Sequence, residues 1–71
     1  MKTIEELRKE REWSQFELAV KVGVTPGAVG NWERGRSEPK TRQLRALAFA
    51  FGIPMEQIAI NDDDREDFAA A

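Results

Sequence analysis

The signals that end one helix and begin the next lie only a few residues apart, and this spacing constrains the fold more than any other feature. Ser14 and Glu17 form a capping box at the start of a helix. Gly23 can adopt the left-handed conformation that ends a helix. Thr25 is a good capping residue, and Pro26 suits the first helical position because its missing N–H is not needed there. The sequence therefore predicts two short helices, over residues 15–22 and 26–34, joined by a tight turn at residues 23–25.

The flanking segments carry helix signals of the same kind. Thr3 and Glu6 form another capping box, which predicts a helix over about residues 4–12. Apolar residues recur at helical spacing over residues 41–51, and Pro54 opens a short fifth helix that we expect to reach about Ile60. The expected fold is all-α, a compact five-helix domain with a helix-turn-helix at its second and third helices. The expected inward residues are Ile4, Leu7, Leu18, Ala19, Val22, Val29, Trp32, Leu44, Leu47, Ala48, Phe51, Met55 and Ile58.

Charge divides the chain into two parts. Residues 1–60 carry ten Lys and Arg against eight Asp and Glu, whereas residues 61–71 carry one Arg against five Asp and Glu. A net charge of −2 for the 71 residues thus hides a mildly basic body and an acidic end. A chain of this length forms one domain at most. We expect that domain to span residues 1–60, followed by an acidic, flexible tail over residues 61–71.

The residue types that are missing exclude several classes of function. The chain has no cysteine and no histidine, which removes disulfides, thiolate metal ligands and the commonest general base. The run from Asp62 to Asp64 lacks the spacing and central glycine of a calcium loop. We therefore expect no enzyme activity, no metal and no cofactor. No apolar run approaches the roughly 20 residues of a membrane span, and the N-terminus lacks the layout of a signal peptide, so the expected location is the cytoplasm.

A concentrated basic stretch follows the paired helices. From Arg34 to Arg45 there are five Lys and Arg against Glu38, a local charge of +4. Such a stretch bears on phosphate binding more than the charge of the whole chain does. A solvated loop and helix face would have the same composition, and this alternative stays open from the residues alone.

Positions from about Leu7 to Ile58 stand in the order and spacing of a known family. They are Ser14, Gln15, Leu18, Ala19, Gly23, Val24, Thr25, Val29, Trp32, Glu33, Gly35, Pro39, Leu44, Leu47, Ala48 and Gly52. This pattern resembles the Cro and phage-repressor family of helix-turn-helix domains, also called the xenobiotic response element family. The family includes lambdoid-phage repressors and restriction-modification controller proteins.

The resemblance implies that the helix over residues 26–34 lies in the major groove of double-stranded DNA and that its N-terminal residues meet base edges. Asn31 is the only good reader there, because its amide can pair with adenine N6 and N7, and Ala28 could meet a thymine methyl. Small residues would let the backbone approach DNA closely, although a weakly specific recognition helix would have the same composition. The expected exposed, base-contacting residues are Pro26, Gly27, Ala28, Gly30 and Asn31.

The resemblance also implies contacts to the phosphate backbone, which position the domain and do not read sequence. Gln15 begins a helix, where free N–H groups and the helix dipole favour a phosphate. In the family this glutamine often supports the recognition helix as well. Thr25 has a similar position, although capping alone explains it. The expected phosphate-contacting residues are Gln15, Thr25, Arg34, Arg36, Lys40 and Arg42, with Arg36 and Lys40 foremost.

Two further pairs of residues have expected structural roles. Arg8 and Glu33 match a pair that forms an internal salt bridge in the family and ties the first helix to the end of the third. Glu33 beside a phosphate would repel it, so its charge must be neutralised or turned inward. Trp13 and Trp32 are expected in the core, because aromatic residues at helical spacing usually pack there.

Family dimers commonly use the fifth helix and the loop before it. We therefore expect a two-fold homodimer, which would place two recognition helices about 34 Å apart on a pseudo-palindromic operator. The alternative is that the same apolar residues merely complete a small core. The expected interface residues are Phe49, Ile53, Met55 and Ile60, with Phe68 as a further candidate.

The expected function is sequence-specific binding of double-stranded DNA by a small transcriptional regulator, a repressor of prokaryotic or phage type. Few residues remain beyond the fifth helix, so we expect no effector domain, no small-molecule effector and no membrane partner. The alternative is a protein-interaction module of the same fold, of the antitoxin or bridging-factor type, which the acidic end of the chain would suit. The basic stretch from Arg34 to Arg45 separates the two, because a DNA binder needs it and an adaptor tolerates its neutralisation.

Overall fold

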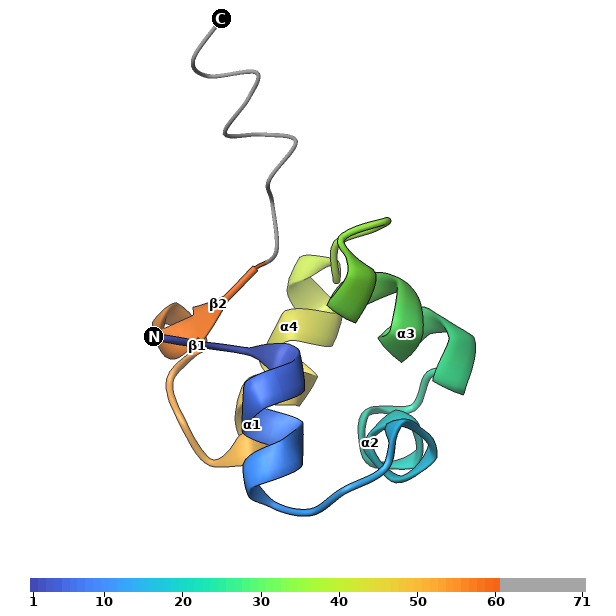
Figure 1. Ribbon diagram of the computed structural model, residues 1–71. Helices are drawn as coiled ribbons and strands as arrows, with labels where there is room; N and C mark the ends of the chain where they lie inside the picture. Colours follow the sequence, from blue (N-terminus) through green and yellow to red (C-terminus); the bar gives the residue numbers. More distant parts are fainter. Residues whose placement is uncertain (61–71) are drawn as a thin grey trace, which may run out of the picture.

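The computed structural model describes residues 1–60 of the protein. The fold of this part is mostly helical, with α1 (Ile4–Glu10), α2 (Gln15–Val22), α3 (Pro26–Arg34) and α4 (Thr41–Phe51) packed together (Figure 1). The predicted helices over residues 15–22, 26–34 and 41–51 are confirmed. The acidic tail and Phe68 lie outside the described residues.

Side-chain caps fix where α1, α2 and α3 begin. The Thr3 hydroxyl accepts a hydrogen bond of 3.1 Å from the Glu6 N–H, and the Glu6 carboxylate accepts one of 2.8 Å from the Thr3 N–H. Ser14 and Glu17 repeat this arrangement at 3.0 and 2.7 Å. Thr25 accepts from the Ala28 N–H at 3.1 Å. These bonds satisfy backbone donors that have no partner within their own helix.

The first helix is shorter than predicted, because it ends at Glu10 and not near Glu12. Glu12 has a φ of 59°, in the left-handed region, and so leaves the helical path. The turn allows the Trp13 N–H to donate to the Arg8 carbonyl at 3.1 Å. It also brings the Trp13 ring onto the ring of Phe51, with centroids 5.9 Å apart. Packing against α4 therefore decides the end of α1.

The prediction of a fifth helix reaching Ile60 is wrong. A single 3-10 turn, η1 (Met55–Gln57), leads into a short strand, β2 (Ile58–Ala59). This strand pairs in parallel with β1 (Lys2–Thr3), with Lys2 opposite Ile58 (Figure 1). The extended backbone lets the Ile58 side chain enter the core, where the residue is 4 % exposed, while Ile58 and Ala59 pair with Lys2 and Thr3. The described fold is therefore mostly helical with a small two-stranded sheet, and not purely all-α as expected.

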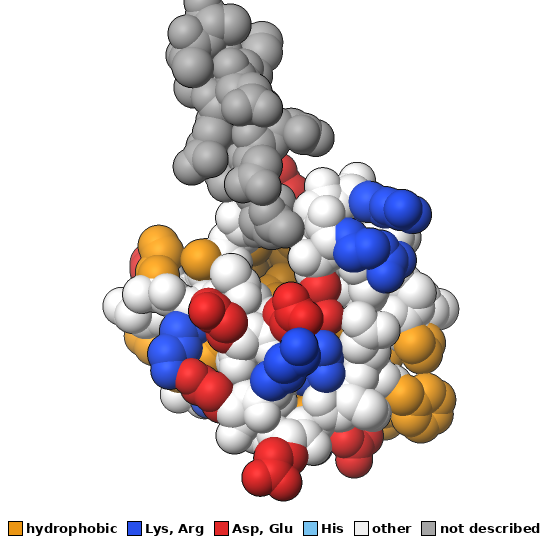
Figure 2. Space-filling model, in the orientation of Figure 1, with side chains coloured by type: hydrophobic (Ala, Val, Ile, Leu, Met, Phe, Trp, Pro, Cys, Tyr) orange, Lys and Arg blue, Asp and Glu red, His pale blue; other side chains and the backbone are white. Residues whose placement is uncertain are grey.

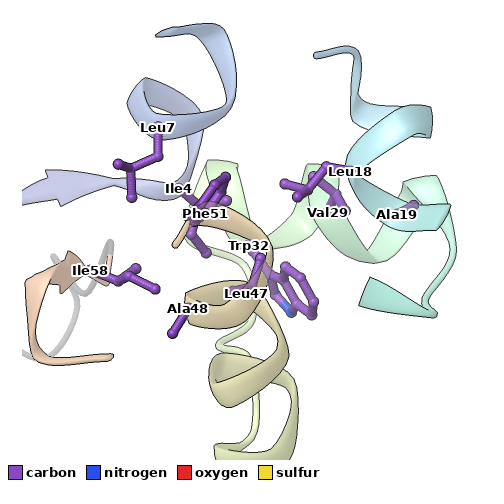
Figure 3. Packing of buried hydrophobic residues seen from close by; sticks show 10 residues of the cluster. All are labelled: Ile4, Leu7, Leu18, Ala19, Val29, Trp32, Leu47, Ala48, Phe51 and Ile58. Atoms are coloured by element: carbon purple, nitrogen blue, oxygen red, sulfur yellow. The ribbon is translucent and has the colours of Figure 1, made fainter. Parts of the chain in front are cut away.

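One hydrophobic core joins all four helices and β2. Leu18 of α2 and Val29 of α3 point toward each other, and Trp32 lies beside Leu47 of α4 (Figure 3). Three of these residues, Leu18, Val29 and Leu47, are fully buried, so α3 is held by its inner face against α2 and α4. The expected core position of Trp32 is confirmed, whereas Trp13 is half-buried at the edge of the core. The buried apolar residues are Ile4, Leu7, Leu18, Ala19, Val29, Trp32, Leu47, Ala48, Phe51 and Ile58.

Candidate nucleic-acid interface

The outer face of α3 is the candidate recognition surface. Val29 and Trp32 bury the inner face of this helix, and α3 lies at the edge of the molecule beside α2 (Figure 1). On the other side, Pro26 and Gly27 are exposed and Asn31 is half-buried, whereas Ala28 is half-buried at the edge of this face and packs against the core. Asn31 brings a side-chain amide to this face, among residues with small or apolar side chains.

The expectation that Gly30 is exposed is wrong, because the structure buries it. The cover is the side chain of Arg34, one helical turn further on. A methyl group on Gly30 would lie 3.3 Å from Nη2 and 3.4 Å from Nη1 of Arg34. The Arg34 Nη2 also donates a long hydrogen bond of 3.4 Å to Oδ1 of Asn31. The guanidinium therefore lies back along α3 and does not extend past its end.

Arg8 and Glu33 form a buried ion pair that ties α1 to the end of α3. The Arg8 Nε donates to Glu33 Oε2 at 2.7 Å and its Nη2 donates to Oε1 at 3.1 Å. The two side chains are 10 % and 5 % exposed. These hydrogen bonds raise the pKa of the Arg8 guanidinium above its ordinary value. The Glu33 carboxylate thus points inward with its charge paired.

Gln15 belongs to the same network. Its side-chain amide donates to Glu33 Oε1 at 2.9 Å and so links the first residue of α2 to the last turn of α3. The resemblance implied that Gln15 supports the recognition helix as well as contacting a DNA phosphate, and this hydrogen bond holds the two paired helices together. The Arg8 Nη1 also donates to the Trp13 carbonyl at 2.8 Å, a contact with the loop between α1 and α2 that the sequence did not indicate.

Basic side chains gather where α3 ends. Arg34 and Arg36 are exposed there, and Lys40 and Arg42 are exposed at the start of α4. Figure 2 shows Lys and Arg side chains over the C-terminal end of α3 and the loop that follows it. An open groove between the turn of the paired helices and the start of α4 is lined in part by Val24, Lys40 and Arg42. The structure thus brings the predicted phosphate-contacting cations to the surface next to α3.

The four expected interface residues do not form one exposed surface. Phe49 is 89 % exposed on the outer side of α4. By contrast, Ile53, Met55 and Ile60 are half-buried and pack against the core. Exposed apolar residues also occur on α2, where Phe16 and Val20 are 64 % and 65 % exposed one turn apart. The exposure of Val20 was not predicted, and its only signal in the sequence is its place off the inward stripe of α2.

Residues 1–60 bring together no group of three or more Asp, Glu, His or Cys side chains that could hold a metal ion. The run from Asp62 to Asp64 lies outside the described residues. None of the helices described in the structure is long and apolar enough to cross a membrane.

The geometry defines a class of protein. Two short helices joined by the turn at residues 23–25, with the inner face of the second locked into the core and its outer face presented, constitute a helix-turn-helix domain. The chain belongs to the helix-turn-helix family of the Cro and phage-repressor type, and residues 4–58 match that family.

Curated relatives come from fungi, bacteria and phages. The chain is 35 % identical to multiprotein-bridging factor 1 of Candida albicans over 54 residues, which are 76 % of this chain and 36 % of that protein. It is 30 % identical to the cryptic phage CTXphi transcriptional repressor RstR of Vibrio cholerae over 64 residues, 90 % of this chain and 58 % of the repressor. The immunity repressor protein of Bacillus phage phi105 is 36 % identical over 55 residues, 78 % of this chain and 38 % of that protein. The chain therefore spans between about a third and three fifths of the length of these relatives.

Proposed function

We propose that this protein is a small transcriptional regulator of the repressor type that binds double-stranded DNA with α3 in the major groove. The observation that carries the proposal is the fixed presentation of α3. Its inner face is anchored by Val29 and Trp32, and its C-terminal turn is held by the bonds of Glu33 to Arg8 and Gln15. A rigid helix with a free outer face beside a basic surface is what major-groove reading requires. The two relatives that are named as repressors support the same function.

Within this function, Asn31 is the principal base reader. Its amide can donate to adenine N7 and accept from adenine N6. Ala28 can contact a thymine methyl, while Pro26 and Gly27 offer no donor or acceptor side chain and allow a close approach of the backbone. Gly30 is buried beneath Arg34. It contributes to the base-facing surface only because it has no side chain and so leaves space above the helix.

The phosphate backbone would be held from both ends of α3. Thr25 and Gln15 stand at the starts of α3 and α2, where unpaired N–H groups favour an anion. Arg36 and Lys40 are the foremost cations, followed by Arg42 and Arg34. These contacts supply most of the affinity and its dependence on salt, and they set the register of α3 in the groove.

The regulator, a prokaryotic or phage-encoded protein, would act in the cytoplasm as a homodimer on a pseudo-palindromic operator. The exposed ring of Phe49 supports a contact across a two-fold axis. The half-buried Ile53, Met55 and Ile60 would contribute the edges that they leave uncovered by the core. Two copies related in this way would present their α3 helices about one turn of DNA apart.

Selection from a random pool of double-stranded DNA tests the function. The protein should enrich a site with two half-sites related by a dyad, each of which contains an adenine that Asn31 reads. The Asn31→Ala variant, which should keep its fold because the side chain is half-buried, should lose preference at that adenine. Enrichment of no sequence by the native chain would contradict the proposal.

A second function is favoured by the bridging-factor relative. A protein whose name describes multiprotein bridging is 35 % identical to this chain, and exposed Phe16, Val20 and Phe49 could serve protein contacts. The chain would then be a protein-interaction module with weak or no specific DNA binding. Neutralisation of Arg36 and Lys40 distinguishes the two functions, because it should weaken DNA binding and its dependence on salt and leave a protein contact through α2 or α4 intact.

A further inference from the structure

The guanidinium of Arg34 lies on the same face of α3 as the side chain of Asn31. It sits over Gly30, where a methyl group would come within 3.3 Å of its Nη2, and that same nitrogen is 3.4 Å from Oδ1 of Asn31. Arg34 is the last residue of α3, yet its charged end is one turn closer to the N-terminus. A long side chain of a helical residue commonly covers the turn that precedes it.

Gly30 provides the space for this arrangement. Any larger residue would place its Cβ against Nη1 and Nη2 of Arg34, at 3.4 and 3.3 Å, so the guanidinium would have to shift by a few tenths of an ångström. Glycine destabilises the interior of a helix relative to alanine. Gly30 does not need the left-handed backbone that favours glycine, because the positive-φ glycines among the described residues are Gly23, Gly35 and Gly52. The local benefit of a glycine at position 30 is therefore the space that it leaves for the guanidinium of Arg34.

We propose that Arg34 is a specificity-determining residue that reads a guanine beside the base pair read by Asn31. This inference rests on the proposed function, and it replaces the expectation that Arg34 contacts a phosphate. The fork of an arginine can donate two hydrogen bonds to guanine O6 and N7, and asparagine pairs in the same manner with adenine. Neighbouring base pairs are about 3.4 Å apart along the duplex, so two side chains that touch each other can address adjacent pairs.

The arrangement also couples the two readers. Asn31 Oδ1 has two lone pairs, so it can accept from Arg34 and from adenine N6 at the same time. The donor from Arg34 favours the orientation in which Oδ1 faces the guanidinium and the Nδ2 group can donate to adenine N7. Arg34 thus acts both as a reader and as a positioning residue for Asn31.

The test uses the native chain and Arg34→Met, which keeps an unbranched side chain and removes every donor that could bind guanine O6 and N7. Affinity is measured for the selected site and for each single-base change in one half-site. Native protein should lose roughly 5- to 150-fold when the guanine is replaced, the range for one bidentate contact. Arg34→Met should discriminate weakly at that position and at the neighbouring adenine, and normally elsewhere. The matched control, Arg36→Met, loses the same charge and should retain the native preference at every position.

Gly30→Ala supplies a second variant in which Arg34 itself is unchanged. The added methyl meets only the end of a flexible side chain, so the protein should fold, with a Tm raised by about 4–8 °C through better helix propensity. The same variant should lose discrimination at the guanine. Higher stability combined with lower specificity is a result that a purely structural role for Gly30 does not produce.

Two outcomes overturn the inference. If Gly30→Ala keeps the native preference at every base, and Arg34→Met weakens binding to all sites equally with a shallower salt dependence, Arg34 contacts a phosphate and reads nothing. The proposed function survives that result. If the native chain enriches no DNA sequence, the proposed function and this inference both fail.

Discussion

The side-chain amide of Gln15 donates a hydrogen bond of 2.9 Å to the carboxylate of Glu33, from the first residue of α2 to the last turn of α3. Arg8 holds the same carboxylate from the side of α1, at 2.7 and 3.1 Å. The relative placement of the paired helices therefore depends on polar contacts as well as on the packing of Leu18 against Val29. Because α3 carries the proposed reading surface, the stability of this network and the affinity for DNA should change together.

Replacing Gln15 tests its role in the network. Gln15→Ala removes one hydrogen bond to a charged group and should lower the free energy of unfolding by about 1.5–3 kcal/mol. Gln15→Glu should lower it further, because a second carboxylate would face that of Glu33. Urea unfolding at pH 7 measures both changes. A Gln15→Glu variant that is as stable as Gln15→Ala would show that the network tolerates like charges.

Removing one member of the buried ion pair should be more severe. Arg8→Ala leaves the carboxylate of Glu33, which is 5 % exposed, without its cation, and it should destabilise the fold by about 3–5 kcal/mol. The matched control is Lys9→Ala, in an exposed pair with Glu5 whose side chains are 64 % and 45 % exposed. That change should amount to less than about 1 kcal/mol. Equal losses in the two variants, measured by urea unfolding, would contradict the structural role assigned to Arg8.

The capping box of α1 gives a pH dependence with a defined sign. The bond from the Thr3 N–H lowers the pKa of Glu6 below its ordinary value of 4.5. A carboxyl group whose pKa is lowered by folding stabilises the folded state above its unfolded pKa, and this contribution is lost as the pH falls through the folded value. Native protein should therefore be more stable than Glu6→Gln at neutral pH, and the difference should vanish below the carboxyl range. Thermal melts of both proteins between pH 7 and pH 3 measure it, and a constant difference would be the contrary result.

The proposed dimer depends on Phe49. A charge at this position, in Phe49→Glu, should convert the dimer to a monomer without unfolding it, because the ring is 89 % exposed and contributes little to the core. Sedimentation equilibrium gives the mass, and circular dichroism reports the fold. Phe16→Glu is the matched control, since Phe16 is an exposed phenylalanine on α2 that lies outside the proposed interface. Dissociation by Phe16→Glu but not by Phe49→Glu would assign the interface to α2.

The sequence predicted the elements whose boundaries depend on neighbouring residues. Ser14 with Glu17 begins α2, and Gly23, with a φ of 75°, ends it. These signals act within a few residues, so they can be read without knowledge of the tertiary structure. The ion pair of Arg8 and Glu33 was available only through the resemblance to the family, because no local rule joins residues so far apart in the chain.

The predictions that failed concern features that depend on contacts between residues far apart in the chain. The end of α1 depends on the stacking of Trp13 on Phe51, and the expected fifth helix gives way to pairing between β2 and β1 at opposite ends of the described chain. Glutamate is a good helix former, so propensity alone extends α1 through Glu12. The burial of Gly30 depends on the path of the Arg34 side chain, which residue spacing does not specify.

Salt-dependent binding tests the central claim, that the surface beside α3 binds DNA, most directly. Fluorescence anisotropy with the selected site should give a log K that falls linearly with log salt for the native chain. The slope should be shallower by about 1.8 in Arg36→Ala/Lys40→Ala, since each phosphate contact contributes about 0.9. The control Lys2→Ala/Lys9→Ala removes the same charge from β1 and α1, which carry none of the proposed contacts, and should keep the native slope. Equal slopes in all three proteins, or binding that ignores salt, would contradict the assignment of this surface to DNA.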